Sequence, residues 1–106
     1  MDYVKEIAAL KSFLKDHNLI LDYHEVNSVH IAILYLCISG REDIVQVTGF
    51  QSSDPKKVWE HLHETLSGTT YFYSYPSDGI EEAGFDFPEF TTVEELRGKL
   101  KNNRKK

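Results

Sequence analysis

The sequence predicts an α+β fold: a two-layer sandwich in which helices cover one face of a small, mainly antiparallel sheet, in the order α-β-β-β-α-β-α. Three observations support this prediction. Apolar residues near the N-terminus recur at helical spacing, three central segments combine β-branched and aromatic residues with short turns, and an Asp-Pro pair at residues 54–55 is typical of a helix start. At 106 residues the chain has the length of one domain, which we assign to residues 1–101.

The first helix is predicted over residues 3–16. Its buried face is indicated by apolar residues at intervals of three or four: Tyr3, Ile7, Leu10 and Leu14. Asn18 follows, and asparagine tolerates the left-handed backbone conformation that commonly ends a helix. The helix therefore presents one apolar stripe to the rest of the domain.

Three strands are predicted next, over residues 19–26, 29–38 and 43–50. Residues 27–28 make a two-residue turn between the first two strands, and residues 39–42 make a four-residue turn before the third. These loop lengths set the register. The expected neighbours are Glu25 with His30, Tyr23 with Ala32, Leu21 with Leu34, Leu36 with Val45, and Leu34 with Val47.

Because side chains alternate across a strand, this register divides the sheet into two faces. The face expected under the helices is almost entirely apolar: Leu19, Leu21, Tyr23, Ala32, Leu34, Leu36, Ile38, Val45 and Val47. The opposite face is mixed: Ile20, Asp22, His24, Ile31, Ile33, Tyr35, Cys37, Ile44, Gln46, Thr48 and Phe50. We expect the mixed face to be partly exposed to water.

The second half of the chain predicts three more elements. A helix is expected over residues 54–66, with Asp at the N-cap and Pro in the first turn. Residues 69–75 predict a fourth strand because they are rich in β-branched and aromatic residues, whereas residues 80–90 are expected to form a loop. Residues 92–95 fit a capping box and predict a short last helix. We expect the basic tail, residues 102–106, to fray.

The charges are distributed unevenly along the chain. Residues 58–96 contain nine acids and no Lys or Arg, and the last ten residues carry six bases and no acid. A net charge of −9 over one segment creates a negative field that repels nucleic acid and attracts basic molecules. We therefore expect a basic protein surface as the partner, and the composition argues against nucleic acid.

Acidic and aromatic residues alternate between residues 78 and 90, which makes this segment the candidate binding site. Its predicted binding residues are Asp78, Glu81, Glu82, Phe85, Asp86, Phe87, Glu89 and Phe90. The carboxylates would attract a basic partner over a distance, and the phenylalanines would anchor it once water is expelled. The alternative interpretation is that the phenylalanines pin the segment to the core while the acids keep the protein soluble.

The sequence predicts no metal site, no cofactor and no catalytic residue. His61 and His63 lie two residues apart on the predicted helix, so they point in different directions and cannot share a metal ion. Glu64 follows them, but the second histidine that a zinc-protease helix requires is absent. The single cysteine, Cys37, lies in a buried-looking strand and is expected to act as a small apolar residue.

Two carboxylate–imidazole pairs are predicted in the sheet, Asp22 with His24 and Glu25 with His30. Such a pair can orient a catalytic base, but no Ser, Thr or Cys nucleophile is placed beside either one. Cross-strand pairs of this kind are also common as plain surface contacts. A small His/carboxylate enzyme therefore remains an alternative, and the sequence leaves the question of enzymatic activity open.

Three tyrosines, Tyr71, Tyr73 and Tyr75, share one face of the predicted fourth strand. Aromatic residues on a sheet can stack nucleic-acid bases, but such sites also need a positive groove, which this segment lacks. We expect the tyrosines to pack inward. If they faced outward, they would suit a protein interface.

The sequence as a whole predicts a small acidic protein-binding module, either an inhibitor that occupies a basic site or an adaptor. A second hypothesis is a homo-oligomer subunit, such as a homodimer, whose mixed sheet face pairs with another copy. No apolar run of about 18 residues occurs, so we expect no membrane span. The N-terminal residues do not match a signal peptide and the chain has one cysteine, which favours a cytoplasmic location.

Overall fold

The computed structural model describes residues 1–38, 44–74 and 82–103. Its elements are α1 (Tyr3–Lys15), β1 (Leu19–Val26), β2 (Val29–Cys37), β3 (Ile44–Ser52), α2 (Pro55–Leu66), β4 (Thr70–Ser74), β5 (Glu82–Asp86) and α3 (Val93–Asn103). Strands β1, β2 and β3 form one antiparallel sheet in that order, and β4 pairs with β5 in a second. The predicted α+β class is confirmed, and β5 is a strand that the sequence analysis did not expect.

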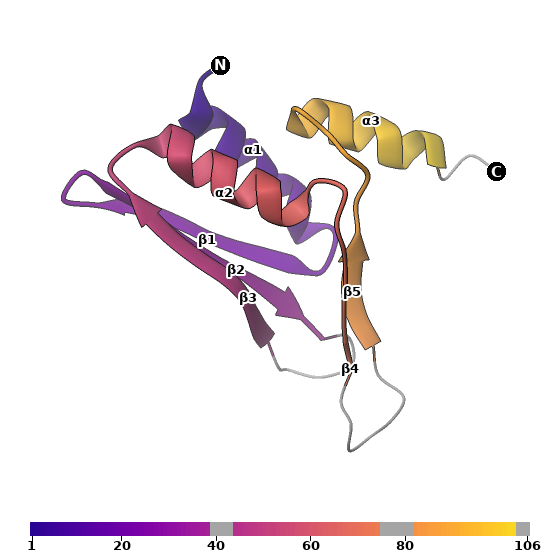
Figure 1. Ribbon diagram of the computed structural model, residues 1–106. Helices are drawn as coiled ribbons and strands as arrows, with labels where there is room; N and C mark the ends of the chain where they lie inside the picture. Colours follow the sequence, from indigo (N-terminus) through magenta and orange to yellow (C-terminus); the bar gives the residue numbers. More distant parts are fainter. Residues whose placement is uncertain (39–43, 75–81, 104–106) are drawn as a thin grey trace.

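Helices α1 and α2 lie on one face of the three-stranded sheet, and the β4–β5 pair stands beside one end of that sheet and leads into α3 (Figure 1). The space between the helices and the sheet is filled by apolar side chains. Those with no exposed surface include Ile7, Leu10, Leu14, Leu19, Leu34, Leu36, Val58, Leu62 and Leu66. Burial of each such side chain contributes about 1.5–3 kcal/mol relative to its exposed state.

The helix ends follow the sequence closely. Asp2 caps α1 by accepting a hydrogen bond from a backbone N–H of the first turn at 3.3 Å, and Asn18 has the expected left-handed conformation, with φ of 61°. Asp54 caps α2 in the same way at 3.0 Å, with Pro55 as the first helical residue. These side chains satisfy backbone donors that the helices themselves leave without partners.

The pairing of β1 with β2 is the predicted one. All three expected neighbour pairs between these strands are present. Asn27 and Ser28 connect the strands with φ angles of 50° and 65°, the conformation of a tight two-residue hairpin turn. The short turn thus fixes which side chains of β1 and β2 face the helices.

The pairing of β2 with β3 is correct at one end and wrong at the other. Leu36 faces Val45 as predicted, but Leu34 faces Thr48 and not Val47. Tyr35 faces Gln46 and Leu34 faces Thr48, so Val47 is an extra residue between the two pairs. Such an insertion is a β-bulge. One extra residue reverses the alternation of side chains for the rest of the strand.

This reversal turns Thr48 and Phe50 toward α2, whereas the sequence analysis placed both on the mixed face. Thr48 Oγ1 lies 2.7 Å from His61 Nε2, and the Phe50 ring stacks on the His61 ring with centroids 4.5 Å apart. The bulge is the physical reason for the error. Both residues belong to the packing between β3 and α2.

Residues 80–90 were expected to form a loop, but Glu82–Asp86 form β5. Gly84 makes this strand possible, because a Cβ atom there would lie 2.0 Å from the Tyr71 carbonyl oxygen and 2.7 Å from a ring carbon of Phe72. Strand propensity alone disfavours a Glu-Ala-Gly sequence, which explains why the strand was missed. At the C-terminus α3 extends through Asn103, two residues past the expected end of the ordered domain. None of the described helices is both long and apolar enough to cross a membrane.

Candidate functional site

The three phenylalanines of the predicted binding segment are buried. Phe85, Phe87 and Phe90 belong to the hydrophobic core, in agreement with the alternative interpretation that they pin this segment to the domain. The Phe87 ring lies 5.9 Å from the Phe13 ring of α1 and 5.2 Å from the Phe85 ring, which in turn stacks on Tyr71 at 5.6 Å. These aromatic side chains therefore tie β5 and the segment after it to α1 and β4.

The acids of the same segment have a different environment. Asp86 and Glu89 are exposed. Glu82 is the first residue of β5, while Asp78 and Glu81 lie outside the described residues. At the described positions this segment therefore exposes carboxylates to solvent and buries its aromatic rings.

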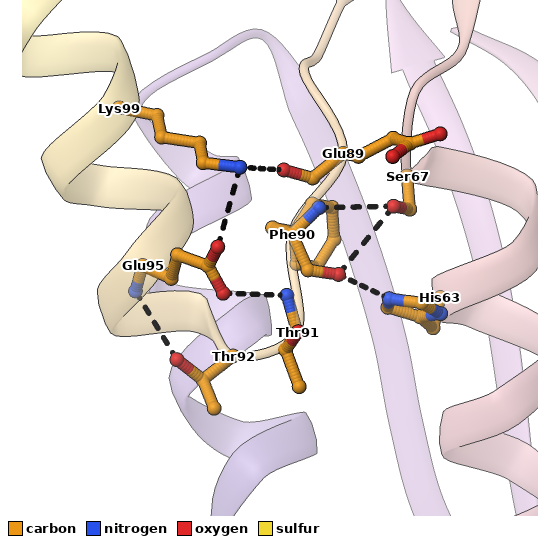
Figure 2. Close-up of polar contacts among 8 residues, drawn as sticks. All are labelled: His63, Ser67, Glu89, Phe90, Thr91, Thr92, Glu95 and Lys99. Atoms are coloured by element: carbon orange, nitrogen blue, oxygen red, sulfur yellow. Dashed lines mark hydrogen bonds and ion pairs between the residues drawn. The ribbon is translucent and has the colours of Figure 1, made fainter.

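Glu89 and Phe90 line a cleft of about 500 Å³ between the end of α2 and the start of α3, which we call the α2–α3 cleft (Figure 2). Its other lining residues are His63, Glu64, Ser67, Thr91, Glu95 and Lys99. Gly68 ends α2 with a φ of 63°, and a Cβ there would lie 2.8 Å from Glu89 Cγ. The glycine therefore both closes the helix and lets the Glu89 side chain cross it.

The floor of the cleft is held by hydrogen bonds from α2 to the Phe90 backbone (Figure 2). Ser67 Oγ accepts from Phe90 N at 3.0 Å and donates to Phe90 O at 3.4 Å, and His63 Nε2 donates to the same carbonyl oxygen. The His63 ring also packs against the rings of Trp59 and Phe90, with centroids 5.8 and 5.1 Å away. His63 and Ser67 are thus engaged in holding the segment in place.

The wall on the α3 side carries a carboxylate and an ammonium group. Glu95 Oε2 accepts from Thr91 N at 2.9 Å, and Glu95 Oε1 lies 3.2 Å from Lys99 Nζ, which donates to the Glu89 carbonyl oxygen at 2.6 Å. The bond from the Thr91 backbone, and then Lys99, lowers the pKa of Glu95. Thr92 Oγ1 accepts from Glu95 N at 3.2 Å, which is one half of the predicted capping box. The Glu95 carboxylate accepts from the N–H of Thr91 and not from that of the N-cap Thr92.

The cleft therefore brings together carboxylates from three separate segments: Glu64 of α2, Glu89 of the connecting segment and Glu95 of α3. The sequence analysis named only Glu89 of these as a binding residue. The excess of acids over residues 58–96 was a signal that acids matter here, but it could not show which of them meet.

The carboxylate–imidazole pairs in the sheet form as expected. Asp22 Oδ1 and His24 Nδ1 lie 3.3 Å apart on the surface, and Glu25 Oε1 lies 3.6 Å from His30 Nε2. The hydroxyl of Tyr23 is 2.9 Å from His30 Nδ1. Burial, followed by the charges of Glu25 and Asp2, raises the pKa of Tyr23, so this hydroxyl stays protonated at neutral pH and is not an activated nucleophile.

The remaining candidate positions have structural surroundings. Tyr71 and Tyr73 are half-buried and pack against the core, as expected, while Phe72 on the other side of β4 is exposed. Tyr75 lies outside the described residues. Cys37 is a half-buried free thiol. Within residues 1–38, 44–74 and 82–103, no three His, Cys, Asp or Glu side chains are grouped as a metal ion would require.

No protein-family model, curated protein or solved structure matches this chain.

Proposed function

We propose that this protein is a protein-binding module whose α2–α3 cleft receives a basic segment of a partner protein. The observation that carries the proposal is the meeting of Glu64, Glu89 and Glu95 around one cleft of about 500 Å³. Lys99 is paired with Glu95 at 3.2 Å, which leaves the carboxylates of Glu64 and Glu89 to meet an incoming Lys or Arg. An acidic cleft of this kind selects cations by charge.

The shape of the cleft suits an extended basic side chain. The half-buried His63 ring provides an apolar surface beside the acids, and long basic side chains lay their methylene groups along such surfaces. The backbone of the cleft is held by Ser67, so little ordering is required when a partner binds.

The electrostatic character of the site sets its expected behaviour. Because the phenylalanines of residues 85–90 are in the core, attraction between charges supplies a large share of the binding energy. Exposed ion pairs contribute about 0.2–1 kcal/mol each. We therefore expect a moderate affinity that is strongly reduced by salt.

The test uses a fluorescein-labelled oligolysine peptide at low ionic strength, with binding followed by fluorescence anisotropy. The double variant Glu64→Gln/Glu89→Gln should bind roughly 2- to 30-fold more weakly, since it loses two pairs of this strength. The control is Asp22→Asn/Glu25→Gln, which removes two exposed carboxylates from β1 and changes the net charge by the same amount.

The control should bind the peptide nearly as well as the native chain. An equal loss in both double variants would show that only net charge matters and would refute a site at the cleft. Binding by the cleft variant at native strength would refute the proposed function outright.

A further inference from the structure

The three-stranded sheet has a second face, opposite the helices, which no described helix or strand crosses (Figure 1). We call it the outer sheet face. The central strand contributes only apolar or weakly polar side chains to it: Val29, Ile31, Ile33, Tyr35 and Cys37. Ile20 and Val26 of β1 and Ile44 of β3 flank them and are exposed. Exposed apolar patches of this kind mark contact surfaces.

The outer sheet face is almost free of charge. Among its described residues Asp22 is the only carboxylate, it lies beside His24 at 3.3 Å, and none is Lys or Arg. Phosphates of nucleic acid or lipid would find no cation there. Charged residues are depleted from the centres of protein interfaces, so this face has the composition of a protein contact.

We propose that the occupant of the outer sheet face is a second copy of this chain. The face has an exposed apolar side chain at the start of β3 and a hollow further along the same strand. The hollow, of about 460 Å³, lies around Gly49 between Ile31, Ile33 and Gln51. The apolar side chain is that of Ile44, which is 53% exposed.

A two-fold axis that crosses the strands would place Ile44 of each copy over the Gly49 hollow of the other. Both copies would then use the same surface, so the association closes as a dimer and does not continue as a fibre. The residues that line the α2–α3 cleft lie on the helix side of the sheet, away from the outer sheet face (Figure 1). The acidic clefts of the two copies would therefore not be brought together.

The size of the face sets the expected strength of the dimer. Three strands of eight or nine residues, about 4.8 Å apart, cover roughly 14 by 30 Å, or about 400 Å² in projection. A standard interface buries about 800 Å² of accessible surface per partner, and smaller ones are weak. We therefore expect a reversible dimer that forms at micromolar or higher concentrations.

Sedimentation velocity over a wide range of micromolar concentrations tests the proposal. The native chain should shift from monomer to dimer, and Ile44→Lys should weaken dimerisation about tenfold or more, because it would bury an ammonium group. Val4→Lys is the matched control, since Val4 is a 42% exposed residue of α1 outside this face. Both positions are exposed enough for the fold to tolerate lysine, which circular dichroism would verify.

A native chain that stays monomeric throughout would overturn the proposal. A dimer that Ile44→Lys leaves intact would also overturn it, because the copies would then meet elsewhere, for example along the edge strands β1 and β3.

Cysteine cross-linking tests the two-fold geometry. In a Cys37→Ser background, Ile44→Cys and Gly49→Cys chains would be oxidised separately and as a mixture. The hollow admits a side chain, since a Cβ at Gly49 meets only the end of Gln46 at 3.2 Å and Ile33 at 3.9 Å. The mixture should give a covalent dimer in excess of either chain alone. Equal cross-linking of a single variant with itself would contradict this arrangement.

Discussion

The α2–α3 cleft and the outer sheet face are opposites in chemistry. The cleft joins three carboxylates from three segments, whereas the described residues of the outer sheet face include one carboxylate among apolar side chains. Charge acts over a distance of several ångströms and is screened by salt, while apolar contact acts only at short range and is largely insensitive to salt. The chain thus presents two surfaces of different chemistry on one small domain, and we propose a different kind of recognition for each.

The largest expected effect concerns how the acidic segment is attached to the domain. Phe87 is 3% exposed and packs on Phe13, so Phe87→Ala should lower the free energy of unfolding by about 3–5 kcal/mol. Phe72 is 65% exposed, and Phe72→Ala should change the free energy of unfolding by no more than about 0.5 kcal/mol. Urea denaturation measures both. Similar losses in the two variants would mean that Phe87 does not anchor the segment.

The next effect concerns the floor of the cleft. Ser67→Ala removes the acceptor of the Phe90 N–H in a partly buried position and should cost about 1–2 kcal/mol of unfolding free energy. Exposed Ser53, between β3 and α2, is the control, and Ser53→Ala should have little effect on urea denaturation. If Ser67→Ala were as mild as Ser53→Ala, the cleft floor would not depend on this hydrogen bond.

Salt should separate the two surfaces directly. Raising the ionic strength from about 0.01 M to about 0.15 M shortens the screening length from about 30 Å to about 8 Å. Oligolysine binding at the cleft should weaken on the order of tenfold, while dimerisation through the outer sheet face should hold or strengthen. Anisotropy and sedimentation on the same samples make the comparison. If salt weakened oligolysine binding and dimerisation to the same extent, the two surfaces would not differ in the way proposed.

The smallest effect is a pH dependence at the wall of the cleft. The pKa of Glu95 is lowered in the folded chain, first by the Thr91 backbone bond and then by Lys99. A lowered pKa contributes stability that is present above the pKa of the unfolded chain and is lost as the pH falls through the folded value. Melting temperatures of the native chain and Glu95→Gln should therefore differ near pH 7 and converge in acid. A difference in melting temperature that stays the same at every pH would mean that Glu95 stabilises the fold through packing and not through its charge.

Local signals in the sequence were sufficient for much of the fold. The Asn27-Ser28 turn determined the β1–β2 register, and Asp54 with Pro55 marked the start of α2. The bulge in β3 was not predictable, because Val47 and Thr48 fit either side of a strand until α2 packs against them. Contacts with α2 therefore decide which side of the sheet each of these side chains occupies.

The acidic character of the candidate site could be predicted from the sequence, but the position of the site could not. The excess of acids predicted an acidic surface, but nothing local showed that Glu64, Glu89 and Glu95 would meet. The basic partner stays a prediction. The phenylalanines alternate with acids in a pattern that fits both an exposed anchor and a buried tie. Only the packing of Phe87 on Phe13 distinguishes the two.

The most direct test of two separate surfaces is a backbone amide NMR experiment on the native chain, first diluted and then titrated with oligolysine. Dilution should shift the amides around Ile33 and Ile44, on the outer sheet face. The peptide should shift those around Ser67, Phe90 and Glu95, in the α2–α3 cleft. Peptide-induced shifts on the sheet, or dilution shifts in the cleft, would contradict the assignment of the two surfaces.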